Sequence, residues 1–304
     1  MQPKVVVVGS CNIDLVARTT RLPRPGETVL ARSLDVIVGG KGANQAIAAA
    51  RAGARCAMIG AVGDDPYAER IRAALRESAV AIDRLRTVSG PSGMALISVD
   101  ATGENSIVVI AGANGHLALA EEDHAVVDEA AAVIVQLEIP VETVIAAASR
   151  ARGIRILNAA PARALPAELW PTIDVLVVNE DEAMTLAPTA VGVDSAIERL
   201  VELVPRVALT LGAKGVRYAE RSGGRITVSP PSARVVDATA AGDAFTGMLA
   251  TALAEGRPAR EALELACAAG SLCVERAGAS TAIPYRAEID GRWAAAYRDV
   301  ASAT

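Results

Sequence analysis

The chain has 304 residues and a formal net charge of −5, and 52% of its residues are hydrophobic. This composition supplies a large core and excludes a disordered chain, while the acidic balance predicts neither nucleic acid nor an anionic membrane as a partner. One Phe and two Trp are present, so aliphatic side chains must build the core.

The four cysteines, Cys11, Cys56, Cys267 and Cys273, form no CxxC pair, and the chain has only two histidines. These spacings do not predict a zinc cluster; they fit buried thiols in a reducing compartment. The first residues, MQPKVVVVGS, lack the basic region and the long apolar run of a signal peptide, and no segment has the length of a membrane span. We therefore expect a soluble, cytoplasmic protein.

Short β-branched runs alternate with longer helical patterns rich in Ala and Leu along most of the chain. Several runs are apolar throughout, as expected when helices cover both faces of a sheet. The βαβα order predicts an α/β fold with a doubly wound, mostly parallel sheet flanked by helices. The predicted strands include Val5–Val8, Cys56–Ala61, Val133–Leu137, Ile154–Asn158, Val175–Val178 and Val207–Leu211, and the predicted helices include Ala43–Ala52, Tyr67–Leu75 and Val141–Arg152.

Two regions, 13–38 and 93–110, contain strand and turn patterns without a helix between them. In the second region, Met94–Val99, the turn DATGEN and Ser106–Ile110 predict a hairpin. These regions form either a small antiparallel sheet that stands off the main sheet as a lid, or additional edge strands. No linker or repeat divides the chain, so we expect residues 1–304 to form one catalytic domain into which the lid strands are inserted.

The segment DATAAGDAF at 237–245 carries the strongest chemical signal. Ala240, Ala241 and Gly242 precede an amphipathic helix, and such small residues let a phosphate approach the unpaired N–H groups of a helix N-terminus. Asp243 could there accept the proton of an attacking hydroxyl while those N–H groups stabilise a transferred phosphoryl group. The alternative is an acidic first-turn residue that only complements the helix dipole.

The segment VGGKGANQA at 38–46 places three glycines around Lys41 and enters a helix with Asn44 in its first turn. Its spacing matches neither a P-loop nor a dinucleotide fingerprint, and a glycine-rich turn before a helix is common. Asn12 and Asp14 make this segment a candidate ligand site, because they follow the first strand, at the edge where open α/β sheets bind ligands. Asn and Asp side chains suit vicinal sugar hydroxyls.

Two further segments follow predicted strands. VVNEDEA at 177–183 places Glu182 where it could hold waters of a magnesium ion, or where an acidic helix start would complement the dipole. TLGAKG at 210–215 could lie against a nucleotide, or form a β-turn between two strands.

In this order, these segments resemble the ribokinase-like family of carbohydrate kinases nearly end to end. The resemblance also covers GDD at 63–65, AGAN at 111–114, QLE at 136–138, NAAPA at 158–162 and ERAGA at 275–279. It implies a parallel sheet flanked by helices, and a β-lid that closes over a sugar and often serves as a homodimer interface.

The resemblance also assigns functions to individual residues. It implies that Asp243 takes the proton from the 5-hydroxyl of D-ribose, which attacks the γ-phosphate of ATP, and that Ala240, Ala241 and Gly242 form the anion hole. The sugar would be bound by Asn12, Asp14, Gly40, Lys41, Gly42, Asn44 and Glu138, with the lid residues Ala95 and Ile107 against its apolar face. The nucleotide would be bound by Asn179, Thr210, Gly212, Gly215 and Gly242, and magnesium through water by Glu182.

A potassium ion beside the anion hole is a further implication of the resemblance. One loop would supply oxygens of Asp237 and Thr239, and another the carbonyls of Cys273, Arg276 and Gly278. The chain departs from the family at Ala282, where a Ser hydroxyl is often found, so backbone oxygens would have to complete the site.

Kinases for deoxyribose, fructose or a nucleoside are the alternatives within this family. Asp14, Glu138 and the complete GGKGANQA segment favour ribose, whereas the scarcity of aromatic residues disfavours a nucleobase. None of the sugar positions is Arg, which disfavours a phosphorylated sugar. A non-catalytic sugar sensor would have no need of Asp243, so the intact AAGD segment favours turnover.

Overall fold

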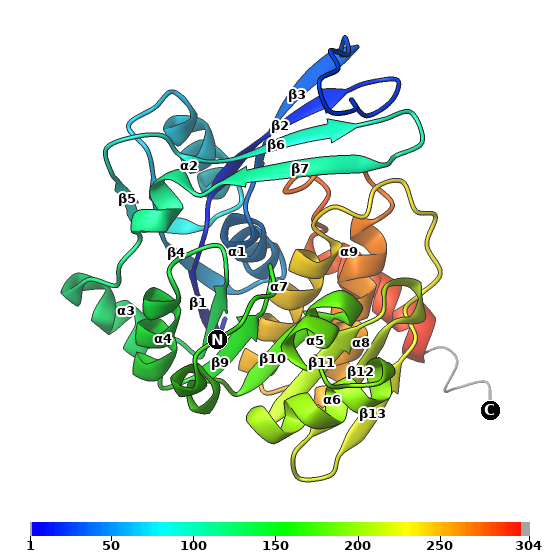
Figure 1. Cartoon of the computed structure of the whole chain (residues 1–304). Helices are drawn as coiled ribbons and strands as arrows, with labels where there is room; N and C mark the ends of the chain where they lie inside the picture. Colours follow the sequence, from blue (N-terminus) through cyan, green and yellow to red (C-terminus); the bar gives the residue numbers. More distant parts are fainter. Residues whose placement is uncertain (1, 299–304) are drawn as a thin grey trace.

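Parallel strands form the centre of the main sheet. They are β1 (Lys4–Val8), β4 (Arg55–Val62), β5 (Ala81–Thr87), β8 (Ala132–Gln136), β9 (Ile154–Asn158), β10 (Val175–Asn179) and β11 (Arg206–Thr210). At one edge β12 (Val216–Glu220) and β13 (Arg225–Val228) pair antiparallel, which gives the order β13-β12-β11-β10-β9-β8-β1-β4-β5. The computed structural model describes residues 2–298 (Figure 1), and it confirms the predicted doubly wound, mostly parallel sheet.

Helices cover both faces of this sheet. One face carries α1 (Lys41–Arg51), α2 (Tyr67–Glu77), α7 (Ala241–Ala254), α8 (Ala259–Cys273) and α9 (Arg286–Trp293), and the other carries α3 (His124–Asp128), α4 (Val141–Arg150), α5 (Glu180–Leu186) and α6 (Gly192–Leu203). Val5 and Val7 of β1 face the first core, whereas Val6 and Val8 face the second. This explains the uninterrupted apolar runs of the central strands.

Short helical turns complete the chain: the 3₁₀ turns η1 (Gly112–His116), η2 (Glu121–Asp123), η3 (Ala167–Thr172) and η4 (Gly212–Lys214), and the π-helical turn η5 (Ala294–Arg298). The predicted helix Val141–Arg152 ends two residues early, because Ala151 already has an extended backbone. Residue 1 and residues 299–304 of the predicted domain lie outside the described part of the chain.

The two irregular regions form a separate sheet, so the alternative of extra edge strands is wrong. Its strands are β2 (Asn12–Arg18), β3 (Ser33–Gly39), β6 (Gly93–Val99) and β7 (Asn105–Ile110), in the order β3-β2-β6-β7. We call this sheet the lid. The prediction of a purely antiparallel lid is corrected by β2 and β6, which pair in parallel. Both strands follow parallel strands of the main sheet and leave it at the same edge, so they point the same way.

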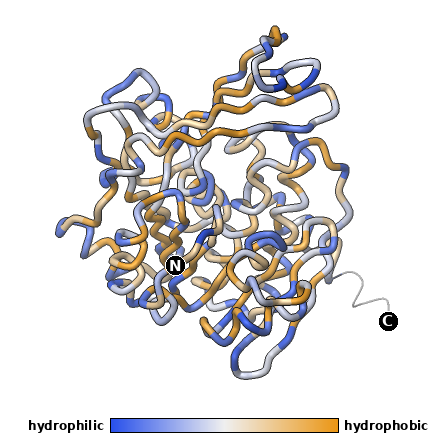
Figure 2. Tube along the Cα trace, viewed as in Figure 1, coloured by the Kyte–Doolittle hydropathy of each residue, from blue (hydrophilic) through white to orange (hydrophobic). Residues whose placement is uncertain are grey.

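The lid stands away from the main sheet (Figure 1), and apolar segments continue along its strands (Figure 2). Its inner ends join the body at Asn12, at Gly39, at Gly93 and at Ile110. At Asn12 and Gly93 the chain enters the lid after strands of the main sheet, and at Gly39 and Ile110 it leaves the lid for α1 and η1. The lid therefore lies over the edge of the main sheet at which β1 and β8 end.

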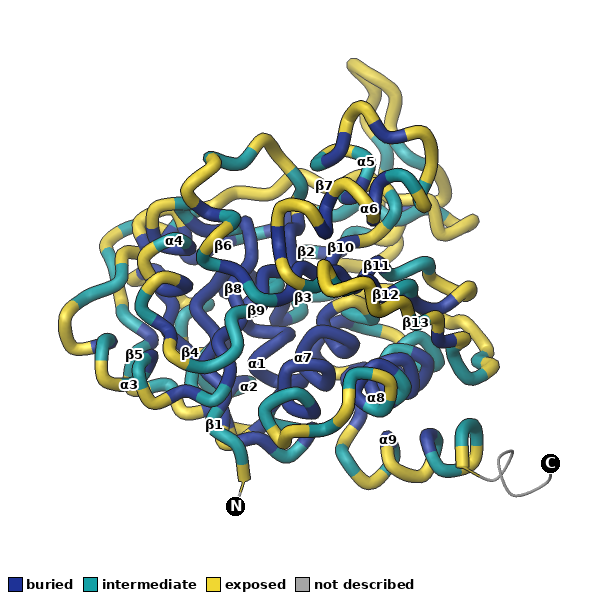
Figure 3. Tube along the Cα trace, turned by 90° about the horizontal axis from the view of Figure 1, so that it is seen from below, coloured by how far each residue is buried: buried dark blue, intermediate teal, exposed yellow. Residues whose placement is uncertain are grey.

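Helices α1 and α7 pack directly against each other in the interior, where Figure 3 shows them buried. Gly247 permits this close packing, because a Cβ at this position would lie 2.4 Å from Cβ of Ala48 and 2.8 Å from the backbone nitrogen of Ala49. The contact brings the first turns of the two helices together at the lid side of the sheet.

No helix within residues 2–298 combines the length and the apolar character needed to cross a bilayer.

Candidate active site

Asp243 occupies the first turn of α7 and is buried against α1. Asn44 donates from Nδ2 to Asp243 Oδ2 at 3.0 Å, and Gln45 donates from Nε2 to Asp243 Oδ1 at 2.8 Å. A carboxylate that only complements a helix dipole does not need burial or two amide partners from another helix. The segments at 38–46 and 237–245 thus meet in direct contact.

Burial raises the pKa of Asp243, while the nearby Lys41 ammonium and the amides of Asn44 and Gln45 oppose this rise. The pKa of Lys41 is itself raised: burial lowers it, but the carboxylates of Asp243, Glu138 and Glu182 outweigh that effect. Lys41 therefore stays charged and is surrounded by acidic groups. Its ammonium group is a ready partner for a phosphate.

The N-terminus of α7 is open to a ligand at Gly242. Ala240 caps the helix with a left-handed backbone at φ 60°, and a Cβ on Gly242 would have no neighbour within 4 Å. The Ala241 N–H donates to Ala238 O at 3.3 Å. The N–H groups of Gly242 and Asp243 come next in the first turn, where helical N–H groups lack partners within the helix.

Glu138 follows β8 and reaches the start of α1. Its Oε2 accepts from Ser10 Oγ at 2.6 Å and from the Lys41 N–H at 3.1 Å. Gly40 has a positive φ of 87°, and a Cβ on Gly42 would lie 2.5 Å from the nitrogen of Ser10. The glycines therefore let the turn before α1 close onto the loop after β1, as the ligand-binding edge of an open α/β sheet requires.

Asp14 of β2 lies over Gly39, where a Cβ would come within 2.1 Å of Asp14 Oδ2. Burial, followed by the negative charges of Glu138 and Asp243, raises the pKa of Asp14 to about 7. Three carboxylates thus influence one another across the space between β2, β8 and α7.

Asn12 is oriented by Asn114 of η1. Asn114 Nδ2 donates to Asn12 Oδ1 at 2.7 Å, and Asn114 Oδ1 accepts from the N–H of Cys11 at 2.9 Å. With its oxygen occupied, Asn12 can offer its amide N–H groups to a hydroxyl. Asn12 and Glu138 also line a cavity of about 350 Å³ together with Arg163 and the lid residue Val109.

The predicted lid contacts occupy different depths. Ala95 is buried, and it pairs with Asp14 on β2 and with Val109 on β7. Ile107 lies two pairs further out, opposite Ile97, and is 52% exposed. Val109, which sequence reasoning missed, lies on the same face of β7 as Ile107. It is closer to Asp14 because it pairs with Ala95, the direct partner of Asp14.

A cavity of about 230 Å³ adjoins Asp243 on the side of Asn179 and Thr210. Its lining residues are Lys41, Asn158, Ala160, Val177, Val178, Asn179, Glu182, Thr210, Ala238, Ala240, Gly242 and Asp243. One cavity is thus lined by the predicted base, by Ala240 and Gly242 of the predicted anion hole, and by three residues predicted to bind nucleotide and magnesium.

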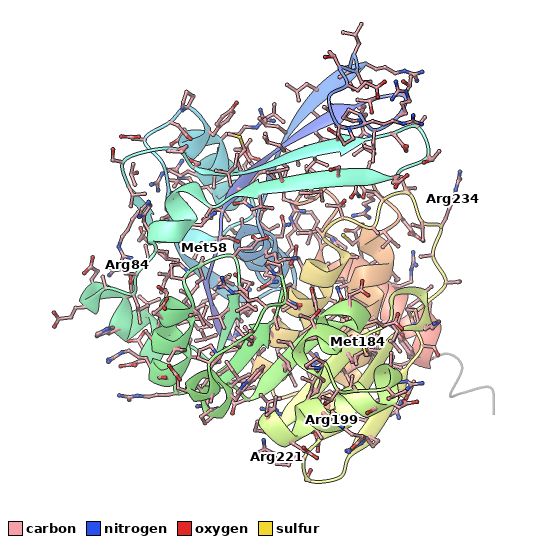
Figure 4. All side chains as sticks on the ribbon, in the orientation of Figure 1. Met58, Arg84, Met184, Arg199, Arg221 and Arg234 are labelled. Carbon is pink, nitrogen blue, oxygen red and sulfur yellow. The ribbon has the colours of Figure 1, made fainter. Side chains whose placement is uncertain are left out.

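Asn179 and Glu182 form a capping box at the start of α5, the helix marked by Met184 in Figure 4. Asn179 Oδ1 accepts from the Glu182 N–H at 2.8 Å, and Glu182 Oε2 accepts from the Asn179 N–H at 2.9 Å. The acidic helix start considered from the sequence is thus present, and Glu182 Oε1 still has no hydrogen bond in the structure's described part. That oxygen suits a hydrated magnesium ion.

Thr210 lines the cavity, but Gly212 and Gly215 do not. The turn Gly212–Lys214 joins β11 to the antiparallel β12, and a Cβ on Gly215 would lie 2.0 Å from Val228 O. The β-turn alternative for TLGAKG is therefore confirmed. Nucleotide binding by the two glycines stays a prediction.

Asp237 connects the two loops that were predicted to hold potassium. Its Oδ1 accepts from the Thr239 N–H at 2.9 Å and its Oδ2 from the Gly278 N–H at 3.0 Å. The guanidinium of Arg276 is turned to Glu288. Ala282 is fully buried. The two loops predicted to supply the oxygens are thus joined through Asp237, and, against the effect of burial, the charge of the lid residue Arg18 also acts on this carboxylate and lowers its pKa.

Sequence reasoning missed four side chains that hold the site together: Ser10, Gln45, Asn114 and Asn158. Each lies inside a segment that the resemblance covers, but a short polar residue beside a motif carries no separate signal. Their function is visible only as hydrogen bonds between segments about 30 to 200 residues apart.

The family model for pfkB family carbohydrate kinases matches residues 2–286. The chain belongs to this family. The resemblance inferred from the motifs is confirmed.

Ribokinases are among its similar relatives. The ribokinase of Bacillus subtilis is 40% identical over 294 residues, which cover 94% of this chain and 98% of the relative. The structure of Arabidopsis thaliana ribokinase complexed with ribose and ATP superposes with a TM-score of 0.90 at 34% identity, covering 96% of this chain and 99% of the other. The ribokinase of Thermotoga maritima has a TM-score of 0.88 at 35% identity, covering 95% and 98%.

The raised pKa of Asp14 predicts a pH-dependent stability of the free protein. The pKa of Asp14 in the folded protein, about 7, exceeds the ordinary value of 3.8. Protonation of Asp14 at low pH therefore stabilises the fold. This contribution is lost as the pH rises through 7. We expect Asp14→Asn to gain about 2–4 kcal/mol relative to the wild type between about pH 4 and pH 8, measured by urea unfolding. Parallel pH profiles of the two proteins would contradict the assignment.

Proposed function

We propose that the protein catalyses ATP-dependent phosphorylation of D-ribose at its 5-hydroxyl, with Asp243 as the general base. The observation that carries this proposal is the contact of Asn44 with Asp243 at 3.0 Å. It places a buried carboxylate between the glycine-rich turn before α1 and a cavity that ends at Gly242. The ribokinases among the relatives, and the structure of Arabidopsis thaliana ribokinase complexed with ribose and ATP, support this substrate pair.

The sugar would lie between the lid and the edge of the main sheet. Asp14 and Glu138 are acceptors for its hydroxyls, and Asn12 and Asn44 offer further amide contacts. The Oδ1 of Asn44 is buried without a hydrogen-bond partner. A buried amide oxygen without a partner is costly, so a hydroxyl that donates to Asn44 would satisfy it while its neighbour on the sugar faces Asp243.

The reaction would then need only short movements of charge. Asp243 accepts the proton of the 5-hydroxyl as its oxygen attacks the γ-phosphorus and the bond to the leaving diphosphate breaks. The N–H groups of Gly242 and Asp243 and the Lys41 ammonium face the transferred phosphoryl group and stabilise its charge. Ala240 and Ala241 are proposed to shape this anion hole through their backbone.

Asn179 and Thr210 are proposed to contact the nucleotide from the other side of the cavity, with Gly212 and Gly215 beyond them. Glu182 would hold magnesium through water, and this ion would supply charge neutralisation at the phosphates. Among the residues of known placement, no group of three or more His, Cys, Asp or Glu side chains could hold a metal by itself. An ion here would therefore depend on water and on the triphosphate for most of its ligands.

The base assignment predicts a large loss of turnover in Asp243→Asn. The amide cannot accept the hydroxyl proton, so kcat should fall by about 10²–10⁴-fold, while ribose still binds. A coupled ADP-release assay measures kcat, and calorimetry measures ribose affinity. As a matched control, Asp290→Asn removes a half-exposed carboxylate of α9 and should leave both unchanged. Turnover close to wild type in Asp243→Asn would remove Asp243 from this function.

A screen of deoxyribose, fructose and nucleosides in the same assay tests the substrate. Highest kcat/KM with ribose is expected. A neighbouring pentose can differ by only about 1–3 kcal/mol in transition-state binding, so the comparison must be made in kcat/KM at equal ATP.

We propose that potassium binds between the loops at 237–239 and 273–278 and raises turnover. Asp237 already joins these loops by two hydrogen bonds, and the predicted ligands are carboxylate, hydroxyl and carbonyl oxygens. A bound cation would order the loop that leads into Ala240, and so keep the anion hole formed.

Potassium should therefore raise turnover of the wild type, and Asp237→Ala should lose most of this stimulation. The measurement is the initial rate with potassium against a large organic cation at equal ionic strength. Asp35→Ala, which removes a lid carboxylate paired with Arg18, serves as the control and should keep the response. Equal wild-type rates in both salts would contradict the cation site.

A homodimer through the lid is also proposed. Leu34, Leu96 and Val108 lie on the face of the lid opposite Asp14, and they are 61%, 42% and 58% exposed. Leu96 and Val108 are direct partners across β6 and β7. An exposed apolar patch on a sheet marks a surface that another molecule covers.

The proposed dimer should dissociate in Val108→Asp. Sedimentation velocity should give twice the monomer mass for the wild type and the monomer mass for the variant. Val191→Asp changes an even more exposed valine, in the turn before α6, and should stay dimeric. A wild type that sediments as a monomer at micromolar concentration would exclude this interface.

A further inference from the structure

Gln45 is fully buried beside Asp243, yet it lines neither of the two cavities. Its Nε2 lies 2.8 Å from Asp243 Oδ1 and 2.9 Å from Asn158 Oδ1, and its Oε1 lies 2.7 Å from Gln136 Nε2. One amide thus reaches three polar side chains from three elements. Gln45 can therefore act on a ligand in these cavities only through side chains that it contacts, and of these Asp243 and Asn158 line the cavity.

The direction of the Gln45 amide is fixed independently of Asp243. Asn158 donates from Nδ2 to Val177 O at 3.2 Å, and this bond turns its Oδ1 toward Gln45. A reversed Gln45 amide would place its oxygen against that acceptor and its NH₂ group against the NH₂ group of Gln136. This reversal loses the hydrogen bonds to Asn158 and Asp243, and also the one to Gln136 unless Gln136, whose Oε1 has no hydrogen-bond partner, turns with it. The loss falls in a buried site, where unpaired polar atoms are costly.

We propose that Gln45 is a positioning residue for the catalytic base: held from both sides by Asn158 and Gln136, it presents a fixed N–H to Oδ1 of Asp243. Asn44 supplies the second N–H, to Oδ2. Both carboxylate oxygens are therefore anchored, and the lone pairs that remain point away from α1 to the cavity that Asp243 lines. This proposal rests on the function of Asp243 proposed above.

The anchoring also favours the ionised state that a base needs. Amide N–H groups that donate to a carboxylate stabilise its charged form, and for Asp243 they oppose the effect of burial. Other charged groups face Asp243 as well: Lys41 of α1, Asp14 of β2, Glu138 after β8 and Glu182 of α5. The Cys273 thiol of α8 also lies near Asp243, but burial raises its pKa to about 12, so it stays neutral. All of these remain when only Gln45 is changed.

The test is Gln45→Met, which keeps the length of the side chain and removes its N–H groups. We expect kcat to fall about tenfold near pH 7, the acid limb of the kcat profile to move up by about one pH unit, and ribose KM to stay within about twofold of the wild type. A residue that merely supports packing would lower stability without moving the pH profile.

Thr251→Val is the matched control, since it removes another buried polar group from the contact of α1 with α7. Its hydroxyl donates to Gly247 O at 2.9 Å and has no contact with Asp243. The control should melt at a temperature similar to that of Gln45→Met and keep the wild-type pH profile. The proposal is wrong if the acid limb of folded Gln45→Met coincides with that of the wild type.

A second variant keeps the test decisive if Gln45→Met does not fold. Gln136→Met removes the donor to Gln45 Oε1 and should move the acid limb in the same direction by a smaller amount; an unchanged profile overturns the proposal. Asp243→Asn tests the catalytic base separately from the positioning residue. Loss of turnover in Asp243→Asn with a normal Gln45→Met profile refutes only the positioning residue, whereas an active Asp243→Asn refutes the base itself.

Discussion

The packing of α1 against α7 brings the chemistry of this protein together. Gly247 lets the two helices approach, and the approach carries Asn44 and Gln45 to the carboxylate of Asp243. A buried carboxylate without partners would be protonated or excluded from the fold. The two amides from α1 make its burial tolerable, and the same burial removes it from bulk water. The proposed sugar and phosphate sites are therefore parts of one helix pair.

The architecture was largely predictable because its signals are local and repeated. Continuous apolar runs such as Val5–Val8 indicate a sheet covered on both faces, and the glycine-rich and AAGD segments mark the two helix starts of the site. The lid was recognised by the missing helices between its strands. Its mixed pairing was not, because the parallel contact of β2 with β6 depends on where both strands leave the main sheet, which lies outside either segment.

The support of the site was harder to predict. Asn158 is hydrogen-bonded to Gln45, and Asn114 to Asn12, across more than 100 residues of sequence. A single Asn has no periodic sequence pattern from which such a contact could be predicted. Val109 was missed in favour of Ile107 because both lie on the same face of β7, and only the register with Ala95 shows which is nearer. Gly215 is the reverse case, where close backbone approach to Val228 explains the glycine without a ligand.

The parallel pairing of β2 with β6 has a mechanical consequence. All four lid strands join the body of the protein at the same end of the lid. Asn12 is hydrogen-bonded to Asn114, and Ser92, just before β6, to Asp65. Gly39 leads into α1, and the end of β7 leads into η1. Four adjacent connections constrain the lid more than a single one would, so any movement of the lid would be smallest beside them. Asp14 lies two residues from Asn12, and such a movement would displace it less than the far ends of the lid strands.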